Sequence, residues 1–307
     1  MTDTELLQDF KKWLAELRDA AHNTVRAYGF QLNNLVSFLT EQGKSLTTAN
    51  YDDFIAWRAA MKADREPRGI SLAIASARCF YRYAEERNIL RPNPFPSSLK
   101  VSVKDQEPID VPTVAQFLEM RQKARTGPLS RTDAITCAAV LETLAGTGLR
   151  LDALLTLRVQ HLNLDGARPC IVVDSNTMAC KGQKAGTIPM SPYAASALQE
   201  YLAAHPPADG AVIFPLKTGL VREMLDKCTP EGLHFTPHSL RHFYCSMTYF
   251  RNFDGEKNDI LWVRDAAGHS SISTTDGYLK LARRVIQSEL DWELWALGKS
   301  ETKGGAA

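Results

Sequence analysis

The stretch TPHSLRH, residues 236–242, decides how this chain is interpreted. Thr236 is a favourable N-cap residue and Pro237 favours the first helical position, so we predict that a helix begins here. The same stretch carries His238 and Arg241, which are candidates for chemistry. Each has an ordinary structural explanation on its own, so the interpretation depends on the rest of the chain.

Three histidines in and just before this stretch also admit a metal site. His234, His238 and His242 lie at i, i+4 and i+8, and zinc sites do use histidine pairs four residues apart. The predicted helix begins after His234, however, so this histidine need not share the face of the others. No glutamate base lies between the pair, and no third ligand is evident. We therefore expect no metal site.

Four further elements carry candidate residues. They are Arg150 in TGLRLDALLTL (147–157), Lys181 in the turn KGQK (181–184), His269 in AAGHSS (266–271) and Tyr278 in STTDGYLKL (273–281). Taken singly, Arg150 can be a surface residue at a helix start, Lys181 a turn residue and Tyr278 a core residue. His269 can close a helix, because histidine is favourable near the C-terminal dipole.

The first ninety residues predict a helical bundle, because apolar residues recur there at helical spacing. The expected helices run from Leu6 to Leu17 behind a Thr2–Glu5 capping box, from the N-cap Asn23 toward Gly43, from about Thr48 to Ala63, and from near Ser71 to Asn88. We expect Tyr51, Ile55 and Leu72 to face inward. Residues 1–90 therefore form a predicted domain.

Residues 91–110 are rich in proline, serine and charge, which indicates an inter-domain linker before a second domain at 111–307. That domain shows helical patterns to about Arg158. Between Cys170 and Met190 the runs CIVV, TMAC and TIPM predict a small antiparallel sheet. Helices resume at Ser191 and near Asn258. The expected fold class is mainly α with a small antiparallel β-sheet.

The amino-acid composition limits the classes of protein to which this chain can belong. The chain has 36 Lys plus Arg against 35 Asp plus Glu and 44% hydrophobic residues, which suits folded domains and argues against a strongly basic nucleic-acid binder. No apolar run approaches the length of a membrane span, and no secretory signal precedes the first helix. The six cysteines form no CxxC pair. We expect a cytoplasmic protein without a membrane partner.

Local charge departs from net charge between Arg58 and Arg91, where eight basic residues face four acidic ones. Arg78 and Arg82, four positions apart, share a helix face, and Arg68 lies where the chain enters that helix. Taken alone, this pattern favours a solvated helix face over DNA contact. A domain can nevertheless be neutral in sum and positive on one face, which is what a phosphate backbone requires.

Taken together and in this order, TGLR, a lysine in a β-hairpin, HSLRH, and GHSSISTT followed by a tyrosine resemble the tyrosine recombinase (phage integrase) family. The resemblance extends over essentially the whole chain. Residues 1–90 resemble the family's helical, SAM-like core-DNA-binding domain, including the Asn-Pro of RPNPF (91–95), and residues 111–307 resemble its α+β catalytic domain. The resemblance implies a site-specific DNA recombinase that acts through a 3′-phosphotyrosyl intermediate and a Holliday junction.

The resemblance assigns a role to each candidate residue. Arg150 and Arg241 clamp the non-bridging phosphate oxygens, and Lys181 protonates the leaving 5′-oxygen. Tyr278 is the nucleophile. The two histidines, His238 and His269, assist proton transfer and hold the phosphate. Because the covalent bond to the tyrosine retains the energy of the phosphodiester, rejoining the DNA strand requires neither ATP nor metal. The sequence has no Walker A motif, in agreement with this, and no cofactor is expected.

The sequence departs from the family in two places. The family usually has an acid three residues after the first arginine, where this chain has Ala153, with Asp152 one residue early. Cys180 precedes the hairpin lysine, and Gly186 stands where a basic residue is common. Lys184 therefore competes with Lys181 as the general acid.

The expected partners are double-stranded DNA with a specific core site built from inverted repeats, and three further copies in a synaptic homotetramer. In relatives a C-terminal helix docks into the neighbouring protomer. The apolar residues between Leu281 and Leu297 suit that role, and packing within the same chain suits them equally. Two other functions stay open: a DNA-binding accessory protein that has lost catalysis, favoured by Ala153, and a type IB topoisomerase.

Overall fold

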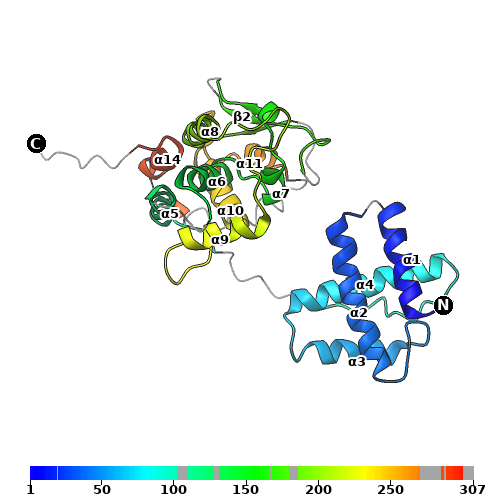
Figure 1. Ribbon diagram of the computed structural model, residues 1–307. Coiled ribbons are helices and arrows are strands. Elements are labelled where there is room, and N and C mark those ends of the chain that lie inside the picture. The colour runs from blue at the N-terminus through cyan, green and yellow to red at the C-terminus, as the bar shows by residue number, and fades with distance from the viewer. Residues whose placement is uncertain are drawn as a thin grey trace, which may run out of the picture. The chain divides into compact units, whose positions relative to one another are not determined.

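A computed structural model describes residues 1–18, 20–101, 110–126, 131–165, 168–179, 186–269, 285–286 and 288–299. The chain divides into two compact units, Met1–Glu107 and Pro108–Ala307, and each is described here by itself (Figure 1). The described elements are helices and one three-stranded antiparallel sheet, which lies in the second unit. The predicted fold class is therefore confirmed. No helix among these residues is long and apolar enough to cross a membrane.

The first unit is a bundle of helices around an aromatic core. Its elements are α1 (Asp3–Glu16), α2 (His22–Thr40), α3 (Tyr51–Met61) and α4 (Pro67–Glu86). The Thr2–Glu5 capping box opens α1 as predicted. The rings of Phe10 and Phe80 meet edge to face at 5.5 Å, which ties α1 to α4. Helix α4 also packs against α2 and α3.

Three predicted helix starts in this unit are wrong by a few residues. Helix α2 begins at His22 after Ala21, so Asn23 is not its cap. Helix α3 begins at Tyr51, because Asn50 accepts hydrogen bonds from two backbone amides of its first turn. Helix α4 begins earlier than expected, at Pro67, since proline suits the first helical position.

Three apolar side chains expected to face the core are exposed instead. They are Tyr51, Ile55 and Leu72, with exposed fractions of 55%, 39% and 38%. Each lies at or near a helix end or on the outer side of its helix, where apolar spacing alone does not distinguish core from rim. Single exposed apolar residues are common in soluble proteins.

The second unit is built around helix α6 (Ala134–Thr147), whose residues from Thr136 to Thr147 are all buried. Most of these residues are apolar and no face of the helix is wholly polar, as expected of a helix surrounded by protein. Figure 1 shows it among its neighbours, and it packs most extensively against three of them. They are α5 (Val114–Thr126), α8 (Pro192–Ala204) and α10 (Pro237–Phe250).

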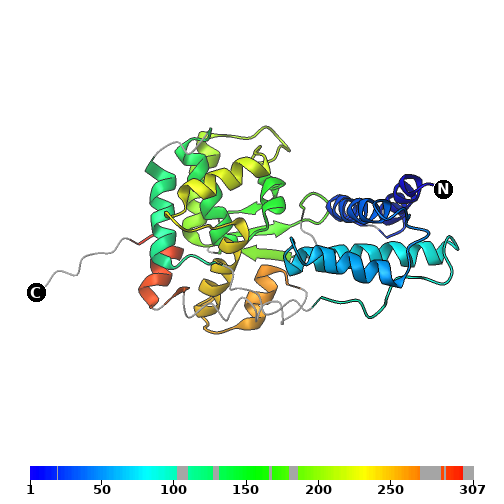
Figure 2. The same ribbon diagram turned by 90° about the horizontal axis from the view of Figure 1, so that it is seen from below.

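The sheet has the order β1 (Leu162–Asn163), β2 (Cys170–Val173) and β3 (Gly186–Pro189), with antiparallel neighbours. Figure 2 shows strands of this sheet side by side. Strands β2 and β3 were predicted, whereas two-residue β1 is too short to produce a pattern. Residues 177–179 of the predicted TMAC strand form a turn and an irregular segment rather than a strand.

Helix α14 (Glu289–Ala296) packs within its own unit. Trp295 is fully buried, and its ring lies near those of Phe243 and Phe253. Arg121 of α5 donates to the carbonyl oxygens of Leu294 and Trp295 at 2.7 and 2.9 Å, which satisfies carbonyls at the helix end. The aromatic side of the C-terminal helix is therefore covered by this chain itself.

Candidate active site

Arg150 is positioned by the turn that joins two helices. Helix α6 ends at Gly148, whose φ of 64° is left-handed, and α7 (Leu151–Leu155) begins with Arg150 as its N-cap. A Cβ at Gly148 would meet Cδ1 of Tyr244 at 2.6 Å, so both backbone angle and space require glycine. This turn directs the half-buried Arg150 side chain into a cavity.

Arg241 joins three of the sequence elements that were singled out. It lies on α10 with only 3% of its surface exposed. Its Nη1 donates to the carbonyl oxygen of Gly148 at 2.5 Å, and its Nη2 donates to the carbonyl oxygen of Ala267. Ala267 ends α11 (Ile260–Ala267), the helix before His269. The guanidinium therefore holds the Arg150 turn and the His269 segment against α10.

The two predicted histidines lie at the ends of helices beside these arginines. His238 belongs to the first turn of α10, which Thr236 and Pro237 begin as predicted. His269 follows Gly268, a left-handed residue that closes α11. The backbone N–H of His269 donates to the carbonyl oxygen of Arg264 at 2.9 Å. Local capping rules explain both placements.

Burial and positive charge keep these imidazoles neutral. Desolvation, and then the charges of Arg241 and Arg150, lower the pKa of His238 below its ordinary value. The same causes lower the pKa of His269 to about 4, with His238 adding to the effect. At neutral pH both rings are therefore uncharged, and each has one ring nitrogen that can accept a hydrogen bond.

A third histidine, His242, packs against His238 on the same helix. His242, one turn after His238 on α10, is buried, and the two rings meet edge to face at 4.6 Å. Burial lowers the pKa of His242 to about 3, with contributions from His238, Arg241 and His269. His234 instead contacts Asp226 at 2.9 Å. Within the described residues, no group of three or more His, Cys, Asp or Glu side chains is arranged to hold a metal.

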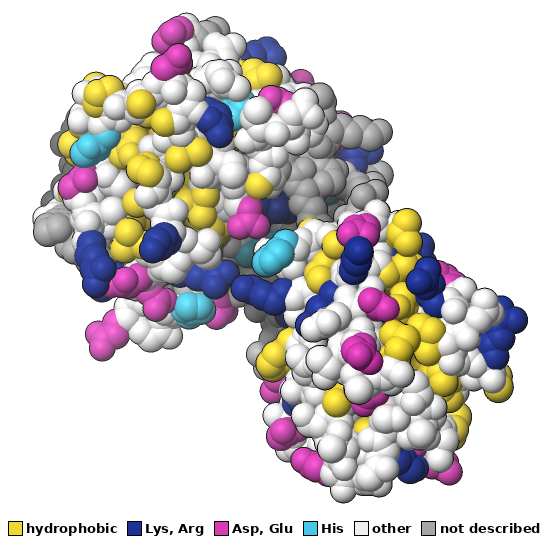
Figure 3. Space-filling view, turned by 45° about the vertical axis from the view of Figure 1, so that its right-hand side comes forward, with side chains coloured by type: hydrophobic (Ala, Val, Ile, Leu, Met, Phe, Trp, Pro, Cys, Tyr) yellow, Lys and Arg dark blue, Asp and Glu magenta, His cyan; other side chains and the backbone are white. Residues whose placement is uncertain are grey.

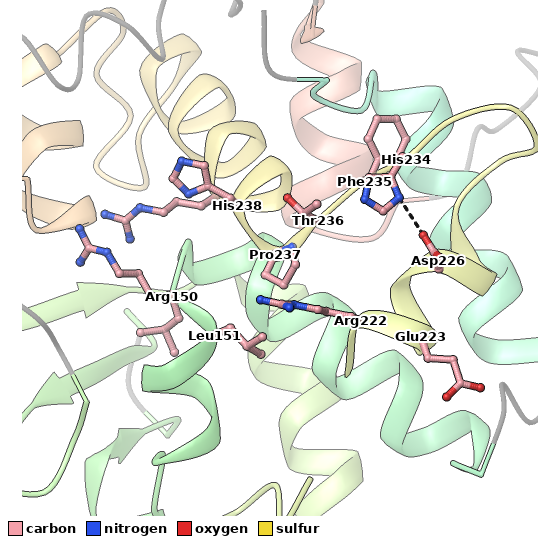
Figure 4. A pocket seen from close by; sticks show the side chains of 12 residues that line it. Arg150, Leu151, Arg222, Glu223, Asp226, His234, Phe235, Thr236, Pro237 and His238 are labelled. Atoms are coloured by element: carbon pink, nitrogen blue, oxygen red, sulfur yellow. Dashed lines mark hydrogen bonds and ion pairs between the residues drawn. The ribbon is translucent and has the colours of Figure 1, made fainter. Parts of the chain in front are cut away.

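Arg150, His238 and Arg241 line one open cavity of about 560 Å³. Its other walls come from the start of α10 and from α9 (Thr218–Cys228), as Figure 4 shows. Arg222 of α9 also lines it and was not predicted from the sequence. An arginine on an amphipathic helix gives no signal that distinguishes a cavity wall from open solvent, so only the tertiary packing identifies it.

Several predicted residues lie outside the part of the chain that the structure describes. These are Lys181, Lys184 and Cys180 in the segment between β2 and β3, and Tyr278 in the segment after His269. The departure at Ala153 is described: its side chain is buried in the core, whereas Asp152 is exposed. Asp152 therefore does not replace the acid that the family usually has at the next position.

The three arginines singled out in the first unit differ in their surroundings. Arg68 and Arg82 are exposed on α4. Arg78 is half-buried, donates to the carbonyl oxygen of Leu99 at 2.5 Å, and lies 5.9 Å from the ring centre of Phe95. Arg78 thus holds its own domain together. Figure 3 shows Lys and Arg side chains interspersed with Asp and Glu on the visible surface.

Comparison with known proteins identifies the class. Residues 112–284 match the phage integrase family, and residues 7–88 match the phage integrase N-terminal SAM-like domain. The first match covers more than half of the chain, so the chain belongs to the phage integrase family. This family is that of the tyrosine recombinases, which the resemblance at the site residues also implied.

Relatives and solved structures agree over nearly the full length. The chain is 28% identical over 301 residues to a tyrosine recombinase XerC of Methylobacterium nodulans, covering 91% of this chain and 90% of the relative. It is 25% identical to a tyrosine recombinase XerD of Listeria innocua serovar 6a, with 91% and 95% covered.

Two DNA-bound structures share the fold. A lambda integrase dimer bound to a COC′ core site has a TM-score of 0.69 at 16% identity, covering 94% of this chain and 80% of that one. A XerH site-specific recombinase bound to its difH substrate has a TM-score of 0.66 at 15% identity, covering 91% and 81%.

Proposed function

We propose that this protein is a site-specific recombinase that cleaves and rejoins DNA strands through a covalent bond between Tyr278 and a 3′-phosphate. The observation that carries the proposal is the gathering of Arg150, His238 and Arg241 around one open cavity, with His269 close behind. This is the set of cationic and proton-accepting groups that phosphodiester transfer requires.

In this mechanism the Tyr278 oxygen attacks the scissile phosphorus while the bond to the 5′-oxygen breaks. Negative charge grows on the non-bridging oxygens, which the permanently charged guanidiniums of Arg150 and Arg241 stabilise. Arg241 is already oriented by two backbone carbonyls, so little reorganisation is needed at the moment of reaction. One phosphodiester replaces another, and the reverse step rejoins the strand without ATP.

Proton transfers complete the step. The phenol of Tyr278 must lose its proton to become nucleophilic, and His238 and His269, whose rings are uncharged at neutral pH, are the candidates to assist that transfer. The leaving 5′-oxygen gains a proton from Lys181, with Lys184 as the competing candidate. A flexible ammonium suits this donation because the alkoxide is a poor leaving group.

The partner is double-stranded DNA that carries a specific core site with inverted repeats, bound by Arg68 and Arg82 among other residues. Four protomers then exchange strands in pairs through a Holliday junction. This assembly is proposed from the family. The docking of the C-terminal helix into a neighbouring protomer would require Trp295 to leave its buried position or the helix to dock through its exposed side.

A nicked suicide substrate that carries the recognition site tests the activity. Wild-type protein should form a covalent adduct visible as a slow band on a denaturing gel, and Tyr278→Phe should form none. An adduct of equal yield with Tyr278→Phe refutes the mechanism. Replacing Lys181 and Lys184 by alanine, one at a time, identifies the proton donor, since only loss of the donor is corrected by an activated 5′-leaving group.

A second candidate is a catalytically impaired DNA-binding protein of the same fold. Ala153 favours it, because this buried apolar side chain offers no carboxylate to orient the neighbouring arginine and histidine. The same gel separates the candidates: site-specific DNA binding without an adduct under any nicked geometry identifies the accessory protein.

A further inference from the structure

A chain of hydrogen bonds holds residues 174–179, the segment that follows β2, against the rest of the catalytic unit. Its centre is His161, the last residue of the short 3-10 helix η1 (Val159–His161), with 2% of its surface exposed. His161 Nε2 and Thr177 Oγ1 lie 2.7 Å apart, and the Thr177 hydroxyl donates to Asp174 Oδ2 at 2.7 Å. None of these residues was singled out in the sequence.

The direction of this chain fixes the protonation of His161. The backbone N–H of Arg158 donates to Nδ1 at 3.0 Å, so Nδ1 carries no proton. Nε2 must then carry it and donate to Thr177, which passes its own hydrogen to the carboxylate of Asp174. Burial lowers the pKa of His161 and Arg158 adds to this, while Asp174 opposes it. The neutral ring is the form that completes the chain.

A second fastening lies at the end of the same segment. The backbone N–H of Ala179 donates to Thr156 Oγ1 at 2.9 Å, and that hydroxyl donates in turn to the carbonyl oxygen of Asp152 at 3.0 Å. Between the two fastenings, Met178 is buried in the core. Thr156 follows the last residue of α7, the helix that Arg150 begins. The segment is thus tied to the element that positions Arg150.

We propose that Thr177, held by His161, and Thr156 are positioning residues for the general acid. Lys181 lies two residues beyond Ala179 in the sequence, and these bonds fix Ala179, the last described residue before the lysine, relative to the helix that Arg150 begins. The inference rests on the proposed function, in which Lys181 protonates the 5′-oxygen. Displacing a catalytic group by about 1 Å can cost on the order of 100-fold in rate, so such anchoring matters.

The test uses two nicked suicide substrates, one normal and one with sulfur in place of the bridging 5′-oxygen. A thiolate leaves without receiving a proton, so cleavage of the sulfur substrate does not need the general acid. Thr177→Val removes the hydroxyl at nearly constant shape, and Thr177→Ser retains it as the matched control. Thr156→Val removes the second fastening independently. Lys181→Ala reports what complete loss of the acid does.

We expect Thr177→Val and Thr156→Val to slow cleavage of the normal substrate by about 10- to 100-fold and to cleave the sulfur substrate at the wild-type rate. Thr177→Ser should resemble wild type on both. Wild-type cleavage of the sulfur substrate by a valine variant also shows that the variant is folded and binds DNA.

Three outcomes overturn the inference. Equal slowing of both substrates means that the bonds support the fold in general, and no slowing of either means that they do not position the acid. If the valine variants are rescued by sulfur but Lys181→Ala is not, Lys181 is not the group being positioned. An absence of adduct with wild-type protein refutes the proposed function itself, whereas the other results leave it intact.

Discussion

The guanidinium of Arg241 donates to the carbonyl oxygen of Gly148 over 2.5 Å, although 93 positions separate the two residues in the chain. This bond places the turn before Arg150 directly against the helix that carries His238. Gly148 can accept it only because its left-handed backbone turns the carbonyl toward α10 while leaving room for Tyr244. The site is therefore assembled through backbone carbonyls as much as through side chains.

The first prediction concerns Gly148→Ala. The new Cβ would lie 2.6 Å from Tyr244 on a residue with φ of 64°, so we expect a loss of roughly 2–4 kcal/mol in the free energy of unfolding and loss of the covalent adduct. Chemical denaturation and the suicide-substrate gel measure the two effects.

Gly210→Ala is the matched control for this prediction. Gly210 has a similar φ of 67°, but a Cβ there would meet nothing within 4 Å. It should cost only about 1 kcal/mol and leave cleavage unchanged. If both variants lose the same stability and both retain the adduct, the close approach to Tyr244 is not what requires glycine.

Local features of this fold could be predicted from the sequence, and non-local ones could not. The helix starts at Ser191-Pro192 and Thr236-Pro237 were predicted because a cap involves only neighbouring residues. The two-residue strand β1 and the bonds from Arg241 to distant carbonyls have no local signature. The roles of the candidate arginines and histidines were assigned through a family resemblance. The position of Arg222 in the cavity wall could be recognised only from the tertiary structure.

The second prediction is a pH dependence of stability. His269 and His242 have pKa values lowered to about 4 and about 3 in the folded protein, against about 6.5 when unfolded. Below pH 6.5 the unfolded chain binds protons that the folded chain does not, so folding is progressively disfavoured. The stabilisation is complete above pH 6.5 and is lost as the pH falls toward 3.

Unfolding measured by denaturant at each pH between 7 and 4 checks this. His242→Gln should flatten part of the slope, because one proton-linked group is removed. A stability that does not vary between pH 7 and 4 would contradict the prediction.

The third prediction concerns Trp295→Ala. This ring is fully buried in the core of the catalytic unit, so truncation should cost about 3–5 kcal/mol. Leu290→Ala on the same helix is the control, since 48% of Leu290 is exposed and its loss should cost little. If both variants unfold like wild type in the absence of DNA, α14 is not held within its own protomer in solution.

The fourth prediction concerns Arg222, the arginine of α9 that lines the cavity with Arg150 and His238 (Figure 4). If the cavity receives a DNA backbone, Arg222→Ala removes a phosphate contact and releases one counterion fewer on binding. We expect weaker binding at all sequences, and the slope of log affinity against log salt should become shallower by about 1.

Arg125→Ala is the control for this experiment, because Arg125 is already paired with Glu200 at 3.2 Å and does not line the cavity. It changes the net charge by the same amount, so long-range attraction alone would affect both variants equally. A shallower slope for Arg222→Ala alone assigns the cavity to the DNA backbone. Equal slopes for wild type and Arg222→Ala would mean that α9 makes no phosphate contact through this residue, and that the DNA approaches Arg150 from another side.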